Sequence, residues 1–304
     1  MTDLAAHVQD YLRLRRSLGF KLESPGHFLA QFVAHLDSVG AETLTAELAI
    51  SWARLPEGVQ PVHWAHRLGA VRGFATYLKT IDPATEIPPH DVFGARQQRP
   101  VPYLWSDAEI ERLMDAARQL RPAMWAATCE TIFGLLAASG MRIGEAVGLQ
   151  RSDVDLTAGV VTIRDGKFGR HRIVPLHETT TAALSSYAAR RDQLSPGSRA
   201  FFVASRAPTL GTGSVQAAFG RITRQVGLRT ESVRPRIHDL RHTFAVRTLI
   251  EWLRAGVDVG AGMSALSIYL GHVNPVGTYW YLQASPELME LAAARLDGRF
   301  GGGR

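Results

Sequence analysis

The chain has 304 residues, 46% of them apolar, and one cysteine, Cys129, which excludes a disordered or collagen-like chain, a disulfide framework and a cysteine-rich zinc module. The formal net charge of +6 is unevenly distributed, because residues 96–304 carry +8 and residues 1–95 carry −2. This basic second part predicts a polyanionic partner, and the absence of a leader pattern and of a membrane-length apolar stretch predicts a cytoplasmic protein with no membrane partner.

Four short helices are expected within residues 1–85, because apolar residues recur there at the spacing of one helical face. Ser24-Pro25 predicts the start of the second helix, since proline is well tolerated at the first position of a helix. The third and fourth helices are expected at residues 43–54 and 61–80. These elements predict a small first domain that is entirely helical.

Residues 86–103 differ from their surroundings, because they are rich in proline and show no helical periodicity. We interpret this segment as a linker between two domains. Directly after it, Ser106 and Glu109 have the pattern of a capping box, which predicts the start of a helix. The second domain is therefore expected to span residues 104–304.

The second domain is expected to be helical with one short sheet. Helical patterns at residues 123–138 and 143–150 are followed by segments with a period of two. Three strands are expected, at residues 154–156, 160–163 and 171–176. Helices resume at Thr179, and the last one begins at Ser285-Pro286. The predicted fold class is mainly α with a small antiparallel β-sheet.

Three polar residues stand out in the first half of this domain. Arg142 and Glu145 are three residues apart, so on a helix they share a face and can form an ion pair. Taken alone, a surface ion pair is the simpler interpretation. Lys167 lies in the turn between the last two strands, where a lysine is usually only solvated. However, only three of the 34 basic residues are lysines, and lysine, unlike arginine, can donate and recover a proton.

Histidines are prominent in the last third of the chain. His238 and Arg241 are three residues apart and can converge on one anion, whereas His238 and His242 have the i, i+4 spacing of metal ligands. A metal site is not expected, because the chain lacks the H-E-x-x-H pattern and offers no clear third ligand. His242 is therefore interpreted as a supporting or structural residue. Further along the chain stand His272, Tyr279 and Tyr281.

In their order and local sequence, four segments resemble the motifs of the tyrosine recombinase (integrase) family. They are SGMRIGEAVGL with Arg142, DGKFGRHRIVPL with Lys167, RIHDLRHTFA with His238 and Arg241, and YLGHVNPVGTYWYL with His272 and Tyr281. The resemblance implies that residues 104–304 form an α+β integrase-type catalytic domain. It also implies that the helical residues 1–85 form a core-binding domain that binds DNA.

This resemblance implies a site-specific DNA recombinase that cuts and rejoins DNA through a 3′-phosphotyrosine intermediate, as in integration, excision or transposition. Tyr281, nine residues after His272, is the implied nucleophile, and Tyr279 is expected to be a packing residue. The implied catalytic set is Arg142, Lys167, His238, Arg241, His272 and Tyr281. Glu145 and His242 are the expected supporting residues.

Transfer of a phosphodiester to a protein oxygen explains why these residue types occur together. A tyrosine hydroxyl, with an ordinary pKa of about 10, must lose its proton as it attacks, and His238 can accept that proton. The fixed donors of the two arginines stabilise the charge that grows on the phosphate oxygens, and His272 adds a further hydrogen bond. The resemblance assigns to Lys167 the protonation of the leaving 5′ oxygen. This inventory requires no metal ion or other cofactor.

The resemblance also implies partners, namely double-stranded DNA recombination sites and a homotetramer assembled on them. It leaves open whether other recombinases take part and whether the last helix docks on its own domain or on a neighbouring protomer. The small residues before His272 resemble transposon-borne members of the family. Expected DNA contacts, each of which could instead lie on a solvated basic face, are Arg13, Arg15, Arg16, Lys21 and Arg72 in the first domain and Arg221, Arg224, Arg229, Arg234 and Arg236 in the second.

Two other functions remain open at this point. A type IB topoisomerase uses the same chemistry to relax supercoils without exchanging strands, but the short chain and the recombinase-like first domain argue against it. A non-catalytic DNA-binding relative is the other alternative, and the complete set of six catalytic residue types argues against that.

Overall fold

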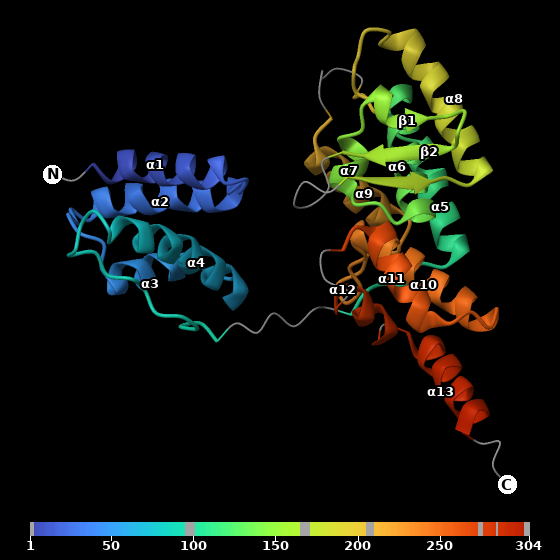
Figure 1. The fold of residues 1–304 in the computed structure, drawn as a ribbon. Helices are drawn as coiled ribbons and strands as arrows, with labels where there is room; N and C mark the ends of the chain where they lie inside the picture. The colour runs from blue at the N-terminus through green and yellow to red at the C-terminus, as the bar shows by residue number, and fades with distance from the viewer. Residues whose placement is uncertain are drawn as a thin grey trace. The chain divides into compact units, whose positions relative to one another are not determined.

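The computed structural model describes residues 3–94, 101–164, 171–204, 210–272, 276–283 and 285–300. The chain divides into two compact units, Met1–Pro100 and Val101–Arg304 (Figure 1). Among the described residues, buried apolar side chains form one cluster in the first unit and two in the second. Within the described residues, no helix is long and apolar enough to cross a membrane. The assignment of the first unit to DNA binding stays a prediction.

The first unit is a bundle of four helices, namely α1 (Leu4–Ser17), α2 (Glu23–Ser38), α3 (Ala46–Arg54) and α4 (Pro61–Leu78). Its core contains the fully buried side chains of Phe32, Trp52 and Phe74. Helix α2 begins at Glu23 rather than at Ser24-Pro25, so Pro25 lies in the middle of the first turn. The fold tolerates this shift because the first backbone N–H groups of a helix have no intrahelical partner in any case.

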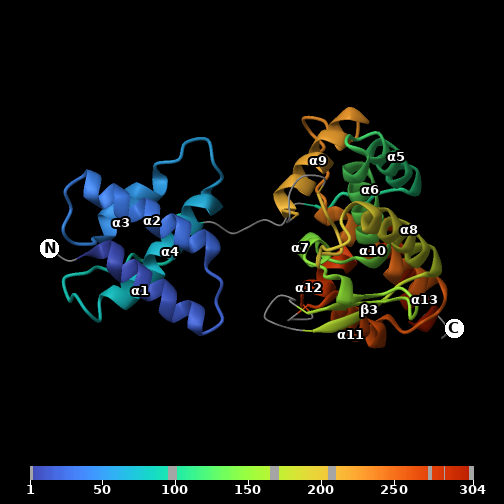
Figure 2. The same cartoon turned by 90° about the horizontal axis from the view of Figure 1, so that it is seen from above.

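The second unit is built mainly from helices. They are α5 (Asp107–Arg118), α6 (Ala123–Ser139), α7 (Ile143–Val147), α8 (Glu178–Leu194), α9 (Thr212–Gln225), α10 (His238–Arg254), α11 (Val259–Leu270), α12 (Val276–Tyr279) and α13 (Pro286–Phe300), with 3₁₀ turns η1 (Arg151–Asp153) and η2 (Trp280–Gln283). The capping box predicted at Ser106 and Glu109 is present at the start of α5. Helix α10 packs against α6, α11 and α13 of the same chain (Figure 2).

One antiparallel sheet of three strands completes this unit, in the order β1 (Val154–Asp155), β2 (Val160–Ile163) and β3 (Arg172–Pro175). Val161 pairs with Val174 across β2 and β3, and both side chains are buried. The expected fold class, mainly α with a small antiparallel sheet, is confirmed. The tip of the hairpin between β2 and β3, which contains Lys167, lies outside the described residues.

Candidate active site

Two glycines that end helices bring the arginines of the site into position. Gly140 follows α6 with φ +60°, and Gly271 follows α11 with φ +67°, a left-handed conformation that favours glycine. The Gly140 carbonyl accepts a hydrogen bond from Nη1 of Arg241 at 2.7 Å, and the Gly271 carbonyl accepts one from Nη2 of Arg142 at 3.0 Å. The two helix ends therefore fix both guanidinium groups.

Gly140→Ala is expected to lower the free energy of unfolding by about 2–4 kcal/mol. The left-handed backbone disfavours any side chain there, and a Cβ would stand 2.5 Å from Cδ1 of Phe244. The matched control is Gly144→Ala, because a Cβ at Gly144 in α7 meets open space, and we expect a change within about 1 kcal/mol. Urea unfolding of both variants tests the pair, and equal stabilities would contradict the role assigned to the Gly140 turn.

Arg142 and Glu145 form the predicted ion pair, but it is not a surface pair. Nη1 of Arg142 donates to Oε1 of Glu145 at 2.8 Å, and the backbone N–H of Arg142 donates to Oε2 at 2.9 Å. The Glu145 side chain is only 4% exposed, and Arg172 pairs with it from β3. Burial alone would raise the pKa of Glu145, but hydrogen bonds from Arg172 and Arg142 outweigh it and lower the pKa to about 2.

Arg241, on the first turn of α10, is 1% exposed. Burial lowers its pKa to about 10, so it still carries a positive charge at neutral pH. Besides the Gly140 carbonyl, it donates through Nη2 to the Leu270 carbonyl at 2.7 Å and meets Nε2 of His272 at 3.0 Å. None of the carboxylates described in the structure forms an ion pair with it, so its charge can serve an anionic ligand.

His272 lies between Arg241 and Thr278. Its Nδ1 lies 2.6 Å from Oγ1 of Thr278. Because arginine can only donate, Nε2 of His272 accepts from Arg241, and the ring proton sits on Nδ1 and points to Thr278. Desolvation and the charges of Arg241 and Arg142 lower the pKa of His272 to about 4, so the imidazole is neutral at neutral pH.

His238 and His242 occupy one face of α10, with ring centroids 4.7 Å apart. Although His238 is exposed to solvent, nearby protein atoms desolvate its ring and, with the charge of Arg241, lower its pKa to about 4. Desolvation and the neighbouring His238 lower the pKa of His242 to about 3. Among the described residues, no group of three or more His, Cys, Asp or Glu side chains is arranged to hold a metal ion.

Tyr281 lies on η2 with its side chain inside the site, at 2% exposure. Its ring stacks on His272 with ring centroids 5.9 Å apart, and it contacts the ring of His242 with centroids 5.4 Å apart. Tyr279 is 51% exposed, so the expectation that it is a packing residue is wrong. The reason is that the segment from α12 into η2 is helical, and residues two apart in a helix do not share a face, so Tyr279 points away from the side that buries Tyr281.

The predicted DNA-contact residues of the second unit lie at its surface. Arg221, Arg224, Arg234 and Arg236 are exposed, and Arg236 also pairs with the buried Asp239 at 2.7 Å. Arg224, Arg229 and Arg234 line a recess of about 480 Å³. Donors grouped in this way can hold phosphate groups of a nucleic-acid backbone.

The basic residues predicted for DNA contact in the first unit already make local contacts. Arg13 pairs with Asp10, Arg15 stacks over the ring of Phe20, and Arg16 donates to the Lys21 carbonyl. Arg72 donates to the Pro89 carbonyl at 3.1 Å. Arg13, Arg16 and Lys21 remain exposed and Arg15 and Arg72 are half-buried, so these contacts leave their charges available to a polyanion.

Sequence reasoning missed two residues that belong to this cluster, Arg172 and Thr278. Arg172 stands two residues before the buried Val174 on β3, so both side chains lie on the same face of the sheet. A charged residue at a core-facing position was the signal that could have identified it. Thr278 gave no comparable signal, because its contact with His272 depends on how α12 packs against α11.

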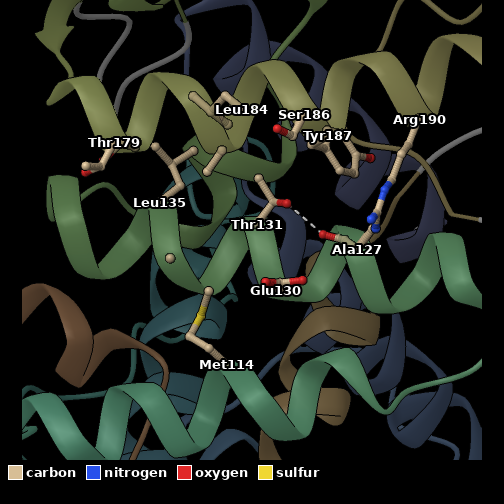
Figure 3. Close-up of a pocket in the computed structure, with 13 residues that line it drawn as sticks. Met114, Ala127, Glu130, Thr131, Leu135, Thr179, Leu184, Ser186, Tyr187 and Arg190 are labelled. Carbon is tan, nitrogen blue, oxygen red and sulfur yellow. Dashed lines mark hydrogen bonds between the residues drawn. The ribbon is translucent and has the colours of Figure 1, made fainter.

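A cavity of about 300 Å³ lies apart from this cluster, between α5, α6 and α8 (Figure 3). Leu135 and Leu184 give it apolar walls, and Glu130 and Arg190 contribute polar groups. None of the arginines, histidines or tyrosines of the cluster described above lines it. The cavity therefore takes no direct part in the chemistry of that cluster.

The chain is similar to known proteins over nearly its whole length. A sequence model of the phage integrase family matches residues 105–287. The chain is 43% identical to the y4rB integrase/recombinase of Sinorhizobium fredii, over 99% of each protein. It is 28% identical to the tyrosine recombinase XerD of Caulobacter vibrioides, over 88% of this chain and 85% of that protein.

Solved structures show the same fold. The Tn1549 transposon integrase in complex with transposon right-end DNA has a TM-score of 0.66 at 17% identity, over 97% of this chain and 99% of that chain. A lambda integrase tetramer bound to a Holliday junction has a TM-score of 0.58 at 17% identity, over 90% and 78%. The chain belongs to the phage integrase family and is a site-specific DNA recombinase of the tyrosine recombinase type.

Proposed function

We propose that this chain recombines two double-stranded DNA sites by attack of Tyr281 on a phosphodiester, which forms a 3′-phosphotyrosine and frees a 5′-hydroxyl. The observation that carries the proposal is the convergence of Arg142, Arg241 and His272 around the buried Tyr281. A 5′-hydroxyl from the partner duplex then attacks the phosphotyrosine. The bond energy is kept in the covalent intermediate, so the reaction needs no external energy source.

The charge of the cluster matches the needs of this reaction. The charge of Arg172 is neutralised by Glu145, with which it is paired, so the two positive charges of Arg142 and Arg241 remain for a ligand. A phosphodiester carries one negative charge, and its five-coordinate transition state carries about two. The site therefore favours the transition state over the bound substrate, which is the condition for faster chemistry.

Proton transfer from Tyr281 is assigned to the neutral histidines. His238 is our candidate acceptor, and His242 lies between it and Tyr281, in ring contact with both. In the DNA-free protein the pKa of His238 is about 4. A bound phosphodiester adds negative charge beside the ring and raises this pKa toward the range in which proton transfer is efficient.

Lys167 is our candidate for the acid that protonates the leaving 5′ oxygen, on the basis of its place in the sequence. Lys167→Ala should cleave ordinary DNA about 10²–10⁴-fold more slowly than the wild-type protein. It should recover on DNA whose scissile 5′ oxygen is replaced by sulfur, because a thiolate leaves without a proton. Arg142→Ala should not recover there, since its contact with the phosphate oxygens is still missing.

Single-turnover cleavage of both substrates tests the acid assignment. The matched control is Lys79→Ala, which removes an exposed lysine from the first unit and should cleave both substrates at the wild-type rate. A Lys167→Ala protein that is equally slow on both substrates would show that Lys167 is not the acid. One that is fast on both would make it an ordinary surface residue.

The proposed partners are DNA and further copies of the chain. Solved relatives of the same fold include XerH bound to its difH substrate and a lambda integrase tetramer on a Holliday junction, which supports a tetramer on two DNA sites. The likeness to the Tn1549 transposon integrase supports a mobile element as the source of those sites. In the second unit, we assign phosphate contacts to Arg221, Arg224, Arg229, Arg234 and Arg236.

A nicked recombination site tests the proposed function. The nick lets the short fragment diffuse away after cleavage, so a covalent protein–DNA adduct accumulates. We expect this adduct, and we expect exchanged products when two intact sites are supplied. If no adduct forms, the chain is a DNA-binding protein without catalytic activity. Relaxation of supercoils without strand exchange would point to a topoisomerase.

A further inference from the structure

Arg172 is nearly buried beneath the site, and the sequence predicted neither its position nor its role. It begins β3, and its side chain is 10% exposed. Nη1 donates to Oε1 of Glu145 at 3.0 Å and Nη2 donates to Oε2 at 2.7 Å, so the guanidinium and the carboxylate meet with two parallel bonds. Nε donates to the Tyr269 carbonyl at 2.8 Å. Three donors of one side chain thus reach two different elements.

Glu145 is shared between Arg172 and Arg142. Oε1 accepts from the side chains of both arginines, and Oε2 accepts from Arg172 and from the backbone N–H of Arg142. The carboxylate therefore has four donors, about as many as its lone pairs can serve. With Arg172 in place, both oxygens of Glu145 are fixed by hydrogen bonds, so the carboxylate that accepts from Arg142 cannot rotate.

The second group that fixes Arg142, the carbonyl of Gly271, also lies close to Arg172. Arg142 donates to the carbonyl of Gly271, and a Cβ placed on Gly271 would stand 2.7 Å from Nη1 of Arg172. The guanidinium of Arg172 thus packs directly beneath the end of α11. Both groups that fix the direction of Arg142, Glu145 and Gly271, are in contact with Arg172.

We propose that Arg172 is a positioning residue, which aims Arg142 at the scissile phosphate by clamping Glu145 and the end of α11; this inference rests on the proposed function. Its planar fork suits the task, because a lysine cannot bind both oxygens of Glu145 and the Tyr269 carbonyl at once. Arg172 also pairs with Ile163 of β2, so the same clamp joins the sheet to Arg142.

The test is a double-mutant cycle on adduct formation with the nicked site, using Arg172→Met with and without Arg142→Ala. Arg172→Met should slow adduct formation by about 10- to 100-fold, because a small displacement of an oriented group costs this much. Its DNA dissociation constant should change less than about twofold. In the Arg142→Ala background, the same substitution should change the rate less than about threefold, because the group that it positions is already gone.

Two further variants keep the comparison decisive. Arg164→Met removes another arginine of the same hairpin, whose exposed side chain pairs with Asp153, and it should leave adduct formation unchanged. Arg172→Lys keeps the charge without the fork and should slow the reaction in the wild-type background alone; it replaces Arg172→Met in the cycle if that variant unfolds, as judged by circular dichroism.

Equal slowing by Arg172→Met in both backgrounds would show that Arg172 acts independently of Arg142 and overturn the inference. No slowing in the wild-type background would overturn it as well. These results differ from failure of the proposed function, in which the wild-type protein itself forms no adduct.

Discussion

Tyr281→Phe is expected to lower the rate at which the covalent protein–DNA adduct forms by about 10⁴-fold or more, while DNA binding stays unchanged. The substitution removes only the attacking oxygen. The phenylalanine ring keeps the stacking on His272 and the contact with His242, so the buried part of the site retains its packing. Denaturing gels of protein trapped on a nicked site measure the adduct, and mobility-shift titration measures binding.

Tyr279→Phe is the matched control for this prediction. It removes the same oxygen two residues earlier, from a side chain that is exposed rather than buried. We expect adduct formation at close to the wild-type rate. An adduct that survives in Tyr281→Phe and disappears in Tyr279→Phe would show that the exposed tyrosine is the nucleophile and that the buried one is structural.

Arg241→Ala is expected to reduce the cleavage rate by about 10²–10³-fold, because it removes a charged donor from a buried site. Arg241→Lys should recover only part of this loss. A lysine restores the charge, but it cannot reproduce contacts that Arg241 makes at the same time with the carbonyls of Gly140 and Leu270 and with His272. Single-turnover cleavage rates at saturating protein measure both variants.

A matched control on the same helix is Arg247→Lys. Arg247 pairs with Asp107 and donates to the Trp105 carbonyl, outside the site, so its replacement should leave cleavage unchanged. Thermal unfolding of all three variants shows whether a slow protein is still folded. Near-normal cleavage by a folded Arg241→Lys protein would mean that charge alone is sufficient and that the planar geometry of the guanidinium is not needed.

Local signals in the sequence were enough for most elements of the fold. The capping box at Ser106 and Glu109 is made by residues three apart, so it could be predicted without knowledge of the rest of the chain. The strands around Val161 and Val174 could be predicted for the same reason, because alternation shows within four or five residues. The start of α2 was placed two residues late, since Ser24 and Pro25 are both compatible with several positions in a first turn.

The arrangement of the site depends on contacts between distant residues, and these could not be predicted from local patterns. The carbonyls that hold Arg241 and Arg142 come from positions 101 and 129 residues away, at the ends of α6 and α11. The Arg142–Glu145 pair could be predicted from its spacing, but not its burial, because Arg172 reaches it from β3. Tyr279 was misplaced because no local pattern showed that this segment is helical, and residues two apart in a helix do not share a face.

Mapping the amino acid that carries the trapped DNA tests directly whether Tyr281 is the nucleophile. The adduct formed on a nicked site is digested with protease and nuclease, and the modified peptide is identified by mass spectrometry. We expect a single modified residue, Tyr281, joined to the 3′-phosphate of the cleaved strand, and a 5′-hydroxyl on the released fragment. A linkage through a 5′-phosphate, or modification of any other residue, would contradict this expectation.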